Sequence, residues 1–169
     1  MNKRRKQDRV KKELEQYLPK GWKTVTITQK ELTKRAKGRL TPGMGEPIVS
    51  TSFGDKTIYF SDELGEEYTE DLLAHEIGHI LLGHEHLEDA SDYDHMKREM
   101  AAWREAAWIR GDLPFWTLLH VACNHKEKTG LDVSTVYRDV KRAAKEVGWT
   151  TIPRSIWSKM RKELKERFD

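Results

Sequence analysis

Two histidines and a glutamate, His75, Glu76 and His79, constrain the fold of this chain more than any other sequence feature. Residues four apart lie on one face of an α-helix, with Cβ atoms about 5 to 6 Å apart. Two imidazoles at that separation can bind one metal ion, because each Zn–N bond measures about 2.0 to 2.1 Å. Glu76 lies one residue further round the same face, where a carboxylate can take a proton from a metal-activated water. The spacing therefore predicts a helix that carries a zinc site of the His-Glu-x-x-His type.

The residues around this motif favour a helix. We expect the helix to begin near Thr69, with Glu70 and Asp71 in an acidic first turn, and to end at Gly83. Its apolar face is predicted to consist of Leu72, Leu73, Ile77, Ile80 and Leu81. The alternative interpretation is an ordinary amphipathic helix with surface histidines. A chance match in a chain with 7 histidines is expected roughly 0.03 times, which favours the metal site.

The composition limits the compartment and the ligand types. A chain of 169 residues is long enough for one domain with a real core, or for one domain with a helical appendage. Cys123 is the only cysteine, so no disulfide can form within the chain and no zinc site can be built from thiolates. Residues 1–12 are basic but lack the apolar stretch of a signal peptide, and no apolar run is long enough for a membrane span. We expect a cytoplasmic protein that does not bind membranes.

Charge is segregated along the chain. The net charge is +10 over residues 1–40, −12 over residues 41–105 and +5 over residues 106–169. The acidic middle contains the predicted metal site, which suits attraction of cations and of a basic substrate segment. Solvated loop charge around residues 85–94 is the simpler explanation for part of this acidity.

The hydrophobic pattern predicts an α+β fold with a small three-stranded sheet, an active-site helix and a helical C-terminal part. We expect strands at residues 22–28, 47–53 and 56–61, with the last two joined by a turn at Gly54-Asp55 and the last lying along the substrate cleft. Residues 41–45 are predicted to be a loop. Residues 29–37 are expected to be a short helix or a turn. Further helices are expected at residues 8–18, 96–110, 115–128, 133–147 and 153–167.

A catalytic zinc needs a third protein ligand and an open position for water. Glu99 is a candidate, because we expect it to begin a helix whose small Ala101 and Ala102 permit close packing against the histidine helix. His84, His86, His95 and the carboxylates of the connector between the two helices are alternatives. The residues alone leave this choice open.

The run from Leu73 to His84 resembles the ImmA/IrrE metallopeptidases of bacteria, mobile elements and phages, whose zinc helix ends in the same Leu-Gly-His. The preceding strand Thr57-Ile58-Tyr59-Phe60 and the later Glu99-Met100-Ala101-Ala102 are also similar to that family, and the resemblance covers roughly residues 45–115. It implies a zincin-like metallopeptidase domain over residues 1–115, followed by a helical subdomain over residues 116–169. It also implies that Glu99 is the third ligand of Zn²⁺, with Glu76 as the general base.

The resemblance further implies a protein substrate, because family members often cleave a helix-turn-helix repressor encoded nearby. For oxyanion stabilisation we consider Tyr59, Tyr68, Tyr93 and His95 without choosing among them. The strand at residues 56–61 is expected to hold the substrate as an added strand.

The alternative function is a non-catalytic regulatory module with a structural or vestigial zinc site. Basic residues near the N-terminus, or Lys141, Arg142 and Lys145 in the C-terminal helices, would then contact nucleic acid or a partner protein. The simpler interpretation of residues 130–147 is an amphipathic helix with Val133, Val136, Val140, Ala144 and Val147 inward. We expect the six tryptophans to serve mostly in packing and Cys123 to be a buried small hydrophobe.

Overall fold

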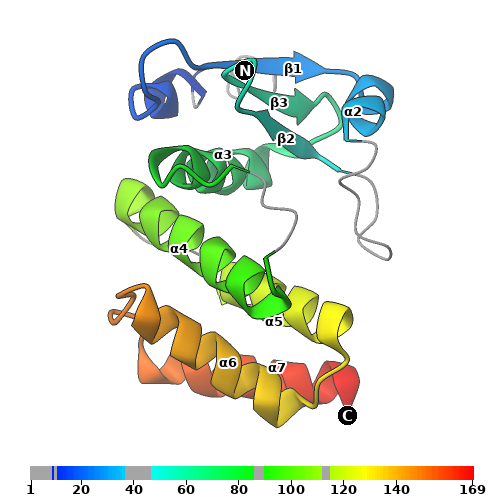
Figure 1. Cartoon of the computed structure of the whole chain (residues 1–169), viewed down its shortest axis with the longest axis vertical. Coiled ribbons are helices and arrows are strands. Elements are labelled where there is room, and N and C mark those ends of the chain that lie inside the picture. The colour runs from blue at the N-terminus through cyan, green and yellow to red at the C-terminus, as the bar shows by residue number, and fades with distance from the viewer. Residues whose placement is uncertain (1–8, 10, 37–46, 86–89, 112–114) are drawn as a thin grey trace. The chain divides into compact units, whose positions relative to one another are not determined.

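The computed structural model describes residues 9, 11–36, 47–85, 90–111 and 115–169 (Figure 1). The chain forms two compact units, Met1–Glu85 and His86–Asp169, which are described separately below. The loop predicted at residues 41–45 and the basic run at residues 3–6 lie outside the described residues. The predicted boundary between a peptidase domain and a helical subdomain after residue 115 stays a prediction.

The first unit contains the predicted three-stranded sheet, built from β1 (Lys23–Ile27), β2 (Val49–Ser52) and β3 (Thr57–Ser61) in the order β1-β3-β2. β1 pairs with β3 in parallel, with Lys23 opposite Thr57. β2 pairs with β3 in the antiparallel direction, with Val49 opposite Phe60. The α+β class and the three strands are therefore confirmed.

β3 is the central strand, and all five of its residues are buried. Its backbone groups on both sides are used by β1 and β2. The expectation that this strand holds the substrate as an added strand is therefore wrong, because strand addition requires an unpaired edge. Among the described strands, β1 and β2 are the edges of the sheet.

The first two helices of the first unit are stabilised by local features of the sequence. Residues 11–15 are helical and bury Leu14, so the helix ends three residues before the predicted end at Leu18. α2 (Gln29–Arg35) begins with a capping box, in which the Thr28 hydroxyl accepts from the Glu31 backbone and the Glu31 carboxylate accepts from the Thr28 backbone.

α3 (Glu66–Leu81) is the predicted site helix, but it begins three residues before Thr69, with Gly65 as its N-cap. The Thr69 hydroxyl donates to the Gly65 carbonyl at 3.1 Å, so Thr69 lies inside the helix and does not cap it. Leu73, Ile77 and Ile80 are buried as expected, whereas Leu81 is exposed. The helix ends as predicted at Gly83, which adopts a left-handed φ of 64°.

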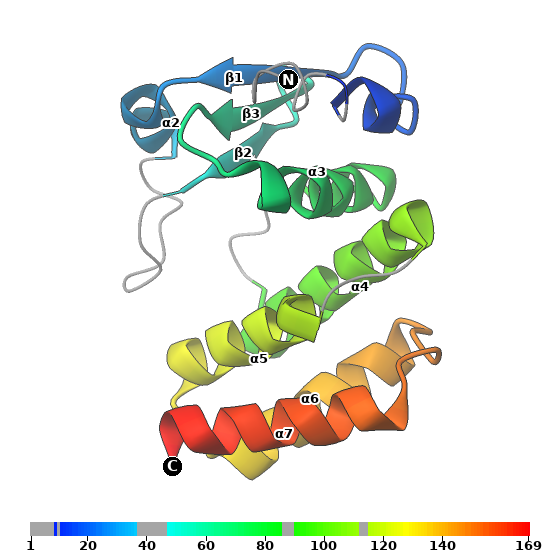
Figure 2. The ribbon, with the colours of Figure 1, turned by 180° about the vertical axis from the view of Figure 1, so that it is seen from behind.

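The second unit is helical and consists of α4 (Asp92–Arg110), α5 (Phe115–Thr129), α6 (Val133–Glu146) and α7 (Arg154–Phe168) (Figure 2). All four helices were predicted, three of them to within a residue or so at each end. α4 begins four residues earlier than expected, because the Ser91 hydroxyl caps it by accepting from the Asp94 backbone N–H at 3.1 Å. Glu99 therefore lies within α4 and not at its start.

The core of the second unit contains Met100, Trp103, Val136, Val140, Met160 and Leu164, all almost completely buried. The buried positions of α6 confirm the amphipathic interpretation, except that Val147 is only half-buried. One packing prediction is wrong, because Cys123 is half-buried and was expected to be buried. Among the tryptophans, Trp103 is buried, whereas the Trp108 side chain is 75% exposed. None of the helices in the described part of the chain is long and apolar enough to cross a membrane.

Candidate metal centre

The two histidines of the motif lie together on α3, as their spacing predicts. The Nε2 atoms of His75 and His79 are 3.1 Å apart, and the two rings meet at 76°. In a tetrahedral site with Zn–N bonds of 2.0 to 2.1 Å, two ligand nitrogens lie about 3.3 Å apart. His75 is buried and His79 is half-buried. The pair therefore has the separation that a shared metal ion requires.

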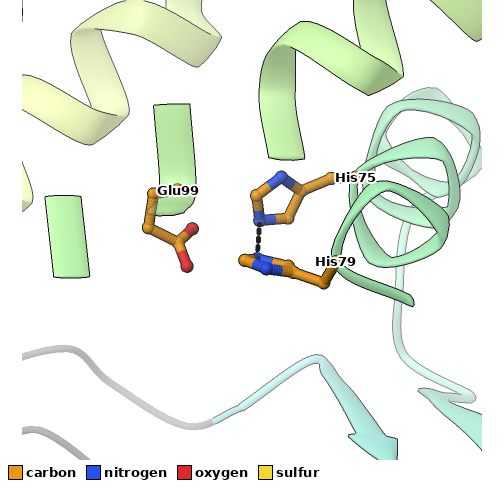
Figure 3. Close-up of side chains that lie close together, drawn as sticks. All are labelled: His75, His79 and Glu99. Atoms are coloured by element: carbon orange, nitrogen blue, oxygen red, sulfur yellow. Dashed lines mark hydrogen bonds between the residues drawn. The ribbon is translucent and has the colours of Figure 1, made fainter. Parts of the chain in front are cut away.

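Glu99 of α4 contributes a carboxylate to the same group. One ligand atom each from His75, His79 and Glu99 lie within 4.8 Å of one another, and Figure 3 shows the three side chains converging. Two imidazoles and one carboxylate suit zinc, and imidazole also suits copper, iron and nickel. These residues thus form a candidate metal site whose donor set fits zinc.

The candidate metal group does not include the competing histidine ligands among the described residues. The group of metal-ligating side chains found among the described residues does not include His84 or His95. His95 lies in the first turn of α4, where its N–H donates to the Ser91 carbonyl. His86 lies outside the described residues. The structure thus brings together His75, His79 and Glu99.

Glu76 is half-buried on α3, and its carboxylate accepts a hydrogen bond from the Thr51 hydroxyl. Thr51 lies on the edge strand β2, opposite Ile58 of β3. Thr51 is not predicted from the sequence, because only the antiparallel register of β2 brings this residue to α3. The sequence indicates only that Thr51 is a polar residue on a short predicted strand before the histidine motif.

His84 is placed beside the metal pair by the turn that ends α3. Its Nδ1 atom lies 3.0 Å from Nδ1 of His79, and its backbone N–H donates to the His79 carbonyl at 2.9 Å. From the sequence, His84 was predicted only as an alternative ligand. The structure instead shows it on the side of the His79 ring that faces away from His75.

The predicted oxyanion helpers include two tyrosines with carboxylate partners. The Tyr59 hydroxyl donates to Asp55 at 3.2 Å. The Tyr93 hydroxyl donates to Glu146 at 3.1 Å and accepts from Arg142 at 2.9 Å, and burial raises its pKa. Each would have to give up its bond to a carboxylate to stabilise an oxyanion. Tyr68 is exposed.

Comparison with known proteins adds no identification. No family model matches the chain, and no curated protein or solved structure matches it. What the fold and site define is therefore a class: an α+β protein with a candidate His/His/Glu metal site.

Proposed function

We propose that this protein is a zinc-dependent endopeptidase that resembles the ImmA/IrrE metallopeptidases. The observation that carries the proposal is the 3.1 Å separation of the two Nε2 atoms of His75 and His79, with Glu76 between them in the sequence of α3. A site that only stabilises structure needs no glutamate at this position, whereas hydrolysis needs a general base.

Each residue has a defined role in this proposal. His75, His79 and Glu99 bind the metal. A zinc ion held there would lower the pKa of a water molecule and polarise the scissile carbonyl. Glu76 accepts the proton of the attacking water and passes it to the leaving amine. The Thr51 hydroxyl holds the Glu76 carboxylate through its hydrogen bond.

The edge strand β2 is the proposed location for the substrate backbone. β2 pairs with β3 on one side, which leaves its other edge available for strand addition among the described strands. Thr51 belongs to this strand and contacts Glu76. A peptide added along β2 would therefore pass close to the general base.

The proposed substrate is a helix-turn-helix repressor, as the family resemblance implies. The DNA-binding domain of such a repressor is basic, and residues 41–105 of this chain carry a net charge of −12. This charge complementarity supports association between the two proteins.

Incubation of the zinc-loaded protein with repressors encoded beside its gene tests the proposal. We expect cleavage of one repressor at one peptide bond, detected by mass spectrometry. The Glu76→Gln variant should bind zinc and leave the repressor intact. If the intact protein cleaves none of these repressors at any zinc or salt concentration, the proposed function is wrong.

A second candidate function is nucleic-acid binding by α6 and α7. The Lys141 ammonium lies 5.5 Å from the Tyr137 ring centre and 5.8 Å from that of Trp157, and Arg161 lies 5.5 Å from Tyr137. Lys141 and Arg161 form no ion pair with any carboxylate in the described part of the chain, so their charge remains available to phosphates.

The basic residues of α6 and α7 differ in whether a carboxylate already pairs with them, and this difference provides a test of nucleic-acid binding. Arg142 contacts Asp139 and Glu146, so it is a weaker phosphate ligand than the sequence analysis assumed. The affinity of the protein for duplex DNA should fall when Lys141 and Arg161 are both changed to alanine. Lys162→Ala is the matched control, because Lys162 is paired with Glu166. DNA binding that depends on Lys141 and Arg161, together with no cleavage, would favour the binding module.

A further inference from the structure

The two ring nitrogens of His79 have different neighbours. Nε2 lies 3.1 Å from Nε2 of His75, and Nδ1 lies 3.0 Å from Nδ1 of His84. The nitrogen that binds a metal must offer its lone pair, so Nε2 of His79 cannot carry a proton in the metal-bound protein. A neutral imidazole then carries its proton on Nδ1, which faces His84.

This arrangement fixes the direction of the hydrogen bond between the two histidines. Because Nδ1 of His79 is the donor, Nδ1 of His84 must be the acceptor and must be unprotonated. The neutral His84 ring then carries its own proton on Nε2. Histidines that bind metals in proteins almost always donate their second N–H to a carboxylate, a backbone carbonyl or water, which fixes both ring orientation and tautomer. Here Nδ1 of His84 lies where such an acceptor is needed.

The backbone explains why His84 can occupy this place. Gly83 has a φ of 64°, which favours glycine, and its N–H donates to the Ile80 carbonyl at 3.1 Å. The His84 N–H donates to the His79 carbonyl, which completes a Schellman motif at the end of α3. The helix stop therefore brings His84 back over the ring of His79, with ring centres 5.3 Å apart.

We infer that His84 is a positioning residue of the metal site, which accepts the Nδ1–H of His79 and so directs Nε2 of His79 toward the metal. The inference rests on metal binding by His75 and His79 under the proposed function, and it does not depend on peptidase activity. It assigns to Leu82-Gly83-His84 a role in metal affinity in addition to its role as a helix stop.

Zinc affinity of the full chain, measured by competition with a chelator, tests this inference. We expect His84→Ala to weaken zinc binding about 10- to 100-fold, the usual effect of losing such a partner. His84→Asn should restore most of the affinity, because its Oδ1 atom can accept from the same place as Nδ1 of histidine. His120→Ala is the control for loss of an exposed histidine and should bind zinc like the unaltered protein.

Two further measurements separate this inference from its alternatives. Nitrogen-15 NMR of the zinc-loaded protein should show a proton on Nδ1 of His79 and a scalar coupling to Nδ1 of His84. The absorption spectrum of the cobalt-loaded protein should keep its shape in His84→Asn. Unchanged zinc affinity in His84→Ala would overturn the inference, and so would a changed cobalt spectrum, which would make His84 a ligand. Failure of the unaltered protein to bind zinc would instead refute the proposed metal site.

Discussion

In the proposed mechanism, the carboxylate of Glu76 accepts the proton of the attacking water, a role that a purely structural metal site does not require. Glu76→Gln keeps the shape of the side chain but cannot accept the proton of the attacking water. We expect this variant to bind zinc normally and to cleave the repressor about 100- to 10,000-fold more slowly. Cleavage rate and metal content are measured on the same sample. Cleavage at nearly the original rate would show that another group is the base.

Single substitutions also test which residue is the third metal ligand. Glu99 lies within the candidate metal group, whereas His95 lies outside it. We therefore expect Glu99→Ala to weaken zinc binding clearly more than His95→Ala, as measured by chelator competition. The reverse order would transfer the third ligand to the N-terminal end of α4.

Cys123 gives a residue-scale prediction about pH. Burial raises the pKa of its thiol above the ordinary value of about 8.5. Because the thiolate is the reactive form, alkylation by iodoacetamide should be slower than that of a free thiol at neutral pH. The rate should still rise with pH where a free thiol has reached its plateau. Since the chain has no other cysteine, mass spectrometry reports this reaction directly. A rate equal to that of a free thiol at neutral pH would contradict the prediction.

Among the secondary-structure elements, β2 contacts α3 through the hydrogen bond from Thr51 to Glu76, the proposed general base. Thr51→Val removes the hydroxyl that donates to Glu76 and leaves the shape of the side chain nearly unchanged. We expect cleavage to slow by about 10- to 100-fold, since a hydrogen bond to a charged group contributes about 1.5 to 3 kcal/mol and each 1.36 kcal/mol is a factor of ten in rate. Thr51→Ser should retain most of the activity, and zinc content should be equal in both variants. Equal cleavage by the valine and serine variants would exclude this positioning role.

The sequence predicted which helices and strands form, but not all of their starts or their pairing. The apolar periodicity around His75 predicted α3, and its C-terminal stop followed from Gly83. The starts of α3 and α4 were placed too late, because Gly65 and Ser91 act as caps before the apolar periodicity becomes visible. The central position of β3 was missed because it depends on parallel pairing with β1, far away in the sequence. Similarly, the neighbours of Thr51 and His84 follow from register and from a left-handed turn, which local patterns do not encode.

For the molecule as a whole, we expect the segregated charge to steer the proposed encounter with the substrate. The acidic residues of the segment 41–105 should attract a basic repressor domain. Salt screens this attraction, and the Debye length is about 8 Å at physiological ionic strength. We therefore expect kcat/KM for repressor cleavage to fall as salt rises, while kcat changes little. A kcat/KM that does not depend on salt would show that charge does not steer this encounter.

Metal analysis of the whole protein tests whether His75 and His79 bind one zinc ion. After dialysis against metal-free buffer, we expect about one zinc per chain in the unaltered protein and in Glu76→Gln. His79→Ala should retain almost none, because it removes one of the two imidazoles that share the ion. Less than half an equivalent of zinc in the unaltered protein, or equal zinc in His79→Ala, would contradict the account.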